Sequence, residues 1–142
     1  MRCTTWLRCR CGRWCGADAT PVEAARQRWA STFNAADLPG LLALYHPQAV
    51  LWGTTSPVLL DTPAAIAAYF ERTFATLPRP HVEMGQARTR VLGGVALCSG
   101  AYTLHLAAPG GQAHALPARF SFAYVLGEPG WQIVDHHSSV SP

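Results

Sequence analysis

Apolar residues recur at helical spacing in the first part of the chain. They are Val22, Ala25, Trp29, Phe33 and Ala36. This spacing predicts a helix that runs to about residue 36. Thr20 and Glu23 fit a capping box with Pro21 at the first helical position, in which Thr20 accepts a hydrogen bond from the Glu23 amide. We therefore expect the helix to begin at residue 20.

Two further helices and one short strand are predicted before residue 80. The segment 37–45 is expected to form a short helix that ends before Pro47. Residues 49–52 form a short apolar run, which Gly53 and the hydroxyl residues after it interrupt. Thr62 and Pro63 then open a third helix, whose apolar side includes Tyr69. Pro78 is expected to end it.

Beyond residue 80 the apolar pattern changes to the alternation typical of strands. Strands are predicted over 82–92, 95–107, 118–126 and from 130 onward, separated by turns rich in glycine and proline. Three helices followed by four sequential strands, with the early strand joining the sheet, predict an α+β fold. We expect three N-terminal helices packed in a curved antiparallel sheet that forms a cone with one open mouth.

The last strand ends in four consecutive polar residues, His136, His137, Ser138 and Ser139. Buried polar groups cost free energy unless they find partners, so this ending predicts the wall of a polar cavity. Strand alternation places His137 and Ser139 on one face with Asp135, and His136 and Ser138 on the other. The two histidines therefore cannot bind one metal ion together.

Charge and composition exclude several classes of function. Charged residues make up 13% of the chain, about half of the ~25% usual for soluble domains. We therefore expect a homodimer or larger homo-oligomer that covers apolar surface. The chain has no lysine, which excludes Schiff-base chemistry and the P-loop lysine. From residue 17 onward seven arginines face eight acidic residues, which argues against a nucleic-acid partner.

The remaining four arginines lie in the first 16 residues, together with four of the five cysteines. The cysteine spacing does not match a zinc ribbon or finger. We expect residues 1–17 to be a disordered Arg/Cys-rich head and residues 18–142 to form the domain. No segment approaches the ~18 apolar residues of a membrane-spanning helix. The chain as written predicts a cytoplasmic protein, and a periplasmic one if its true start codon lies elsewhere.

Candidate polar residues outside the last strand have structural alternatives. The hydroxyls of 54–56 could serve a site or simply form a turn. Tyr69 could be a core aromatic whose hydroxyl reaches the rim of the cone. Arg119, in an otherwise apolar strand, needs a carboxylate, a carbonyl or a bound anion, unless it lies on an edge strand. Cys98 has no nearby base and is interpreted as buried filler. A zinc site built from distant strands has no support in the spacing.

Four segments together resemble a known family. They are 50–54, 66–70 with Tyr69-Phe70, 118–124, and 130–139 with Trp131 and the terminal tetrad. They resemble bacterial homologues of the association domain of calcium/calmodulin-dependent protein kinase II, within the nuclear-transport-factor-2-like superfamily of cone-shaped domains. The His-His-Ser-Ser ending is similar to the signature of iota-class carbonic anhydrases. The resemblance covers about residues 20–142.

The resemblance implies a pocket in which CO2 is hydrated to bicarbonate. Its catalytic residues would be Thr54, Tyr69, His137 and Ser139, and its substrate-binding residues Trp52, Arg119 and Ser138. Aligning Trp131 with the tryptophan of the kinase domain points His137 and Ser139 inward, whereas a β-bulge would substitute His136 and Ser138. His137 would accept the proton. We expect a metal-free site, with zinc as the alternative.

Two other functions remain open. One is a non-catalytic module for oligomerisation and small-molecule binding, of the association-domain type. The other is a cyclase-like or isomerase-like enzyme, which would need a buried carboxylate as its base. Asp135 is the only candidate for that base near the tetrad.

Overall fold

The computed structural model describes residues 18–108 and 110–142, and the predicted head at 1–17 lies outside them. The helices are α1 (Thr20–Asn34), α2 (Leu38–Leu42) and α3 (Pro63–Thr76). The strands are β1 (Tyr45–Trp52), β2 (His81–Leu92), β3 (Val95–Leu106), β4 (His114–Gly127) and β5 (Gly130–Val140). They form one sheet in the order β1-β5-β4-β3-β2. The predicted α+β class is confirmed, but the sheet is mixed because β1 runs parallel to β5.

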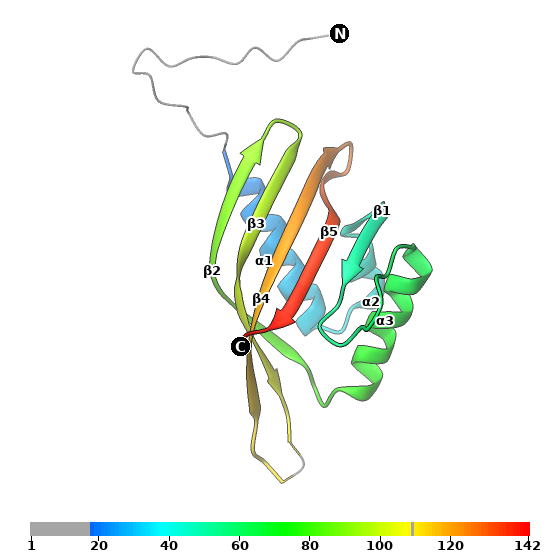
Figure 1. Ribbon diagram of the computed structural model, residues 1–142, viewed down its shortest axis with the longest axis vertical. Coiled ribbons are helices and arrows are strands. Elements are labelled where there is room, and N and C mark those ends of the chain that lie inside the picture. Colours follow the sequence, from blue (N-terminus) through cyan, green and yellow to red (C-terminus); the bar gives the residue numbers. More distant parts are fainter. Residues whose placement is uncertain (1–17, 109) are drawn as a thin grey trace.

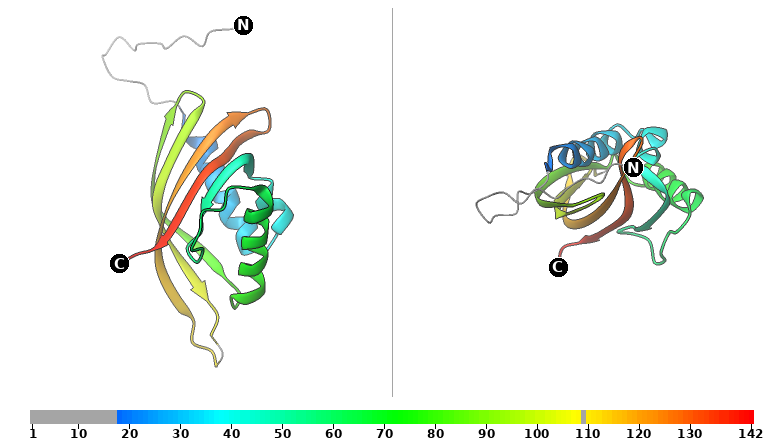
Figure 2. Two further views of the ribbon diagram at one scale, coloured as in Figure 1. Left: turned by 45° about the vertical axis from the view of Figure 1, so that its right-hand side comes forward. Right: turned by 90° about the horizontal axis from the view of Figure 1, so that it is seen from above.

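The sheet is strongly curved, and its concave face holds the helices (Figures 1 and 2). Helix α1 lies along the inside of β2 to β5, while α2 and α3 lie beside β1 (Figure 1). The hairpin between β3 and β4, drawn in yellow, projects beyond the rest of the domain (Figure 1). This arrangement is the predicted cone. Among the described residues, none of the helices is long and apolar enough to cross a membrane.

The predicted capping box at the start of α1 is absent. The Glu23 amide donates to the carbonyl oxygen of Ala19 at 3.0 Å, and the Thr20 amide donates to the Asp18 carboxylate at 3.0 Å. The Glu23 carboxylate is used elsewhere, because it accepts hydrogen bonds from Arg26 and from Thr89 of β2. A tertiary contact has replaced the local one.

The second predicted helix is shorter than expected, and the third begins as expected. Helix α2 starts where the Asp37 carboxylate accepts a hydrogen bond from the Gly40 amide at 3.0 Å. It ends at Leu42, so Tyr45 does not close the helix but begins β1. Tyr45 is buried, and its hydroxyl has partners in the core, which fixes it to the sheet. The Thr62 hydroxyl caps α3 by accepting from the Ala65 amide at 3.2 Å, as predicted.

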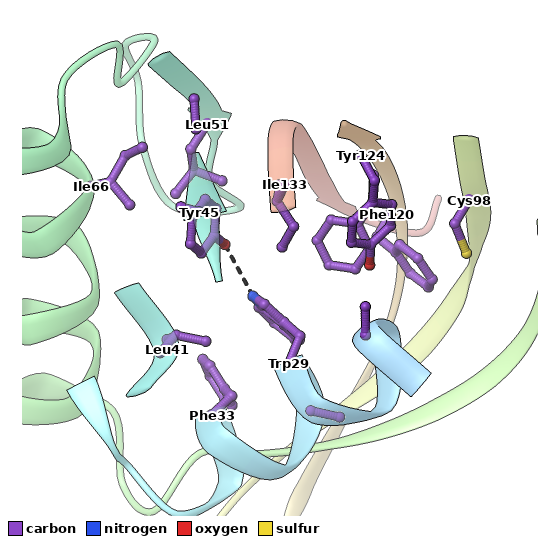
Figure 3. Close-up of a cluster of buried hydrophobic side chains, with 14 of the residues drawn as sticks. Trp29, Phe33, Leu41, Tyr45, Leu51, Ile66, Cys98, Phe120, Tyr124 and Ile133 are labelled. Atoms are coloured by element: carbon purple, nitrogen blue, oxygen red, sulfur yellow. Dashed lines mark hydrogen bonds between the residues drawn. The ribbon is translucent and has the colours of Figure 1, made fainter. Parts of the chain in front are cut away.

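Aromatic side chains form most of the core between α1 and the sheet (Figure 3). Trp29 stacks on Phe33 at a centroid distance of 5.3 Å, and Phe120 and Tyr124 meet this layer from β4. Full burial of one such side chain contributes about 1.5–3 kcal/mol to folding. Cys98 is fully buried beside them, as predicted. The aromatic residues of β4 therefore face the helices and not the outer face of the sheet.

Candidate active site

A β-bulge in β5 decides which members of the terminal tetrad face inward. Ala123 pairs with Asp135, but the next residue of β4, Tyr124, pairs with Ile133. Val134 is therefore the extra residue, and it shifts the alternation of everything after it. His136 is 3% exposed and Ser138 is 9% exposed, whereas His137 lies on the opposite, exposed face. The expectation that His137 and Ser139 face inward is wrong, and the bulged alternative is the one observed.

The inward residues reach a cavity of about 180 Å³ between the helices and the concave face of the sheet. Its polar lining consists of Thr54, Thr55, Tyr69, Thr73, Tyr102, His136 and Ser138. The rest of the lining is apolar and includes Phe33, Leu77, Leu104, Leu116 and Val140. Leu116 and Val140 are also exposed to solvent, which places the opening of the cavity beside them. The cavity is thus apolar at its opening and carries a few hydroxyls inside.

Three hydroxyls from distant parts of the chain meet in the cavity. Thr54 Oγ1 and Ser138 Oγ are 2.8 Å apart, and Tyr102 Oη lies 3.4 Å from Thr54 Oγ1. The chain reaches Thr54 just after β1, Ser138 near the end of β5 and Tyr102 in β3. Sequence analysis missed Tyr102. The alternation of its strand could have identified it, because Tyr102 shares a face with Cys98, which is predicted to be buried.

Tyr69 lines the same cavity, and its position depends on residue 53, which has no side chain. The Tyr69 ring lies directly against Gly53, so closely that a Cβ at position 53 would overlap the ring. Glycine is the one residue that allows such an approach. Gly53 therefore sets how deeply the Tyr69 phenol from α3 enters the cavity beside Thr54.

His136 is held by a buried chain of hydrogen bonds that begins on α1. Trp29 Nε1 donates to the Tyr45 hydroxyl at 3.0 Å (Figure 3), and Tyr45 Oη lies 2.8 Å from His136 Nδ1. The second ring nitrogen, Nε2, is buried without a hydrogen-bond partner among the described residues. Burial lowers the pKa of His136 to about 3, because an apolar environment disfavours the charged imidazole. His136 is therefore neutral at physiological pH.

The other sequence-predicted site residues lie outside the cavity. Arg119, His137 and Ser139 line a hollow on the outer face of the sheet, where Arg119 Nε donates to Ser139 Oγ at 3.2 Å. Trp52 is 44% exposed, and it pairs with His137 of the neighbouring strand β5. Of the seven predicted residues, Thr54, Tyr69 and Ser138 line the cavity, and the other four do not.

The donor groups in the cavity do not fit a zinc ion. Zinc sites use three or four His, Cys or carboxylate ligands. Within 18–108 and 110–142, no three such side chains come close enough to hold a metal. His136 is the single imidazole of the described lining, and its Nδ1 already faces Tyr45. The described lining also contains no Asp or Glu, and Asp135, the candidate base, is exposed on the outer face.

A curved sheet enclosing helices around one internal cavity defines the nuclear-transport-factor-2-like class of domains. Within this class, a family model described as the SnoaL-like domain matches residues 22–142, and the chain belongs to that family. Among curated proteins, none matches the chain.

Several solved structures are similar to this chain. One from Xanthomonas campestris, whose name proposes a calcium/calmodulin-dependent protein kinase II association domain, is 26% identical with a TM-score of 0.80, covering 100% of this chain and 98% of its own. A Streptomyces avermitilis structure, whose name proposes a dehydratase of the NTF2-like family, is 14% identical with a TM-score of 0.81, covering 88% and 97%. A ketosteroid isomerase-like protein from Erwinia carotovora atroseptica is 22% identical with a TM-score of 0.72, covering 87% and 96%. The last two show the fold alone.

Proposed function

We propose that the cavity hydrates CO2 to bicarbonate, as the iota-class carbonic anhydrase resemblance implies. The observation that carries the proposal is the hydroxyl pair Thr54–Ser138, 2.8 Å apart in a cavity whose walls are otherwise largely apolar. Apolar walls suit CO2, which has no net dipole, and paired hydroxyls suit the water that must attack it. Tyr102 Oη lies 3.4 Å from Thr54 Oγ1, and Tyr69 also lines the cavity.

The reaction follows from what a hydroxyl can do, which is to accept one hydrogen bond and donate another. A water held by Ser138 and Thr54 forms a C–O bond to the carbon of CO2. One proton of that water passes to Ser138, the Ser138 proton passes to Thr54, and the Thr54 proton passes to a CO2 oxygen. The product is carbonic acid, which ionises to bicarbonate after it leaves. Hydroxyl dipoles stabilise the developing charge less than a metal ion would, so we expect a modest rate.

The proposed proton path differs from the one expected from sequence. His137 cannot serve as the base for a reaction in the cavity, because it lies on the other side of the sheet. His136 lies in the cavity instead, but it does not act as the base, since its lowered pKa makes it a poor proton acceptor at neutral pH. The hydroxyls themselves therefore move the proton.

Single substitutions on the two faces of β5 test this proposal. Thr54→Val and Ser138→Ala should each lower the CO2 hydration rate about 10²–10³-fold, the usual loss for one charge-stabilising donor. The double variant should lose less activity than the product of the two single losses, because both residues act in one hydrogen-bonded unit. Ser139→Ala and His137→Ala are matched controls from the outer face and should keep most of the activity. Stopped-flow measurement of hydration gives the rates.

Equal losses from Ser138→Ala and Ser139→Ala would contradict the assignment. We propose the reaction without zinc, so a chelator should leave the wild-type rate unchanged. Activity that the chelator abolishes and zinc restores would overturn that part. Absence of hydration in the wild-type protein would remove the carbonic anhydrase proposal altogether.

The size of the cavity favours a second candidate function. A volume of about 180 Å³ exceeds what one CO2 and one water need, since a water in the liquid occupies about 30 Å³. A small apolar molecule with a hydrogen-bonding end would fill it, as in a binding module of the association-domain type. A cyclase or isomerase mechanism is less favoured, because Asp135 is exposed on the outer face.

A further inference from the structure

The hydrogen bonds around Tyr45 restrict where the protons of His136 can be. Trp29 Nε1 is always a donor, so the Tyr45 oxygen accepts from it. The Tyr45 hydroxyl proton must then point elsewhere, and His136 Nδ1 lies 2.8 Å away. Two arrangements are possible, in which Tyr45 either donates to Nδ1 or accepts from it.

The two arrangements differ in the number of groups left without a partner. If Tyr45 donates to Nδ1, every polar group in the hydrogen-bonded series Trp29–Tyr45–His136 has a partner except the N–H at Nε2. If Nδ1 instead carries the proton and donates to Tyr45, the Tyr45 proton and the Nε2 lone pair are both left without a described partner. Buried polar groups without partners are costly, so the first arrangement is favoured.

We propose that Trp29 and Tyr45 fix His136, which lines the cavity and whose Nε2 has no partner among the described residues, as the tautomer protonated on Nε2, so that its imidazole serves as a hydrogen-bond donor to an oxygen of the molecule bound there. Tyr45 is then a positioning residue, because it acts on the ligand through His136. The catalytic part of this inference rests on the proposed CO2 hydration, in which the donor would stabilise the oxygen that gains charge. The tautomer and its bond to a ligand oxygen do not depend on it.

Nuclear magnetic resonance of the imidazole nitrogens tests the tautomer directly. In the wild-type protein we expect Nε2 of His136 to show the shift of a protonated nitrogen and Nδ1 that of an unprotonated one. Tyr45→Phe removes the donor to Nδ1, so the two tautomers should then exchange. Tyr124→Phe is a matched control, since Tyr124 is also buried and its hydroxyl has no described partner. It should leave the His136 signals unchanged.

Bicarbonate is the probe for the ligand contact. Adding it to wild-type protein should move the Nε2 proton signal downfield, and the movement should be smaller in Tyr45→Phe. If CO2 hydration is present, Tyr45→Phe should lower kcat at least about 10-fold with little change in KM, as expected for an imidazole in the wrong tautomer. Tyr124→Phe should retain both values.

Three results would overturn the inference. They are an unprotonated Nε2 in the wild-type protein, a single unchanged tautomer in Tyr45→Phe, and a Nε2 proton that does not respond to bicarbonate. A wild-type protein without hydration activity but with the expected tautomer and bicarbonate response would remove the proposed function and support the ligand contact. The two failures are therefore distinguishable.

Discussion

His136 combines complete burial with a titratable ring, and this makes it the residue that most affects pH dependence. Its pKa is lowered to about 3 by burial, while an unfolded histidine has a pKa of 6.5. The pKa values of Tyr45 and Tyr124 are raised by burial, so these phenols stay protonated at neutral pH. None of these three buried groups changes charge between about pH 6 and about pH 9.

The first prediction at this scale concerns the rate. We expect the kcat of CO2 hydration to be flat from about pH 6 to about pH 9, because the hydroxyl path uses no group that titrates there. A zinc-bound water with a pKa of about 7, or a histidine base near 6.5, would instead give a sigmoidal rise. Stopped-flow profiles in buffers of equal ionic strength distinguish the two, and a midpoint near neutrality would contradict the hydroxyl mechanism.

The second prediction concerns stability. Between about pH 3 and 6.5 the unfolded chain protonates this histidine and the folded chain does not. The free energy of unfolding should therefore fall with decreasing pH, by about 2 kcal/mol between about pH 7 and about pH 5. Urea unfolding at the two pH values measures it. His136→Gln should lose most of this pH dependence, and His137→Gln, on the exposed face, should keep it.

The sequence predicts a cavity wall at the end of β5, and three of the seven predicted site residues line the cavity, but the predicted facing of the histidines is wrong. A polar ending on an apolar strand correctly predicted a cavity wall, and Thr54, Tyr69 and Ser138 do line the cavity. Aligning Trp131 with the tryptophan of the kinase domain points His137 inward only if the strand has no bulge. Val134, the bulged residue, has a side chain common in regular strands and gives no local sign of a bulge. Only its pairing partners reveal the shift.

At the scale of elements, the site depends on how the segment after β1 meets α3. Gly53 lies under the Tyr69 ring, and Gly53→Ala would push that ring out of its place. We predict a loss of about 1–3 kcal/mol in unfolding free energy, as for other overpacked sites, together with reduced hydration activity. Chemical denaturation and stopped-flow assays measure the two effects.

Gly94→Ala is the control for this substitution. Gly94 lies in the turn between β2 and β3, and a Cβ there would meet no atom within 4 Å. It should leave the activity unchanged and alter stability little. If Gly53→Ala behaves like Gly94→Ala, then the close approach of Tyr69 to the backbone does not control the site.

Element boundaries were predictable where local hydrogen bonds decide them. Thr62 caps α3 as its sequence indicates, because both partners lie within four residues. The capping box at Thr20 failed because Glu23 is bonded to Thr89, which lies 66 positions away in the sequence. The prediction that Tyr45 belongs to a helix fails for a related reason. Its hydroxyl partners, Trp29 and His136, come from α1 and β5, which are distant in the sequence.

At the scale of the whole molecule, the outer face of the sheet is the main surface without a covering layer of its own chain (Figure 2). The strand pairing places Val95, Leu97, Ala123 and Val125 together on that face, beside the row Ser99–Ser121–His137. Val95 is 40% exposed. This apolar surface adds to the low charge as a reason to expect an oligomer, whereas the aromatic residues of β4 are buried and cannot contribute to an interface.

We propose a homodimer in which two copies pack through these outer faces. Small residues at its centre, such as Ser121, allow two sheets to approach closely. Ser121→Arg would place a second guanidinium beside Arg119 in each copy and should convert the dimer to a monomer. Gln27→Arg, an exposed position of α1, adds the same side chain on the helical side and should leave the dimer intact. Sedimentation at micromolar concentration measures both. A wild-type protein that sediments as a monomer, or equal effects of the two substitutions, would contradict an interface on the outer face.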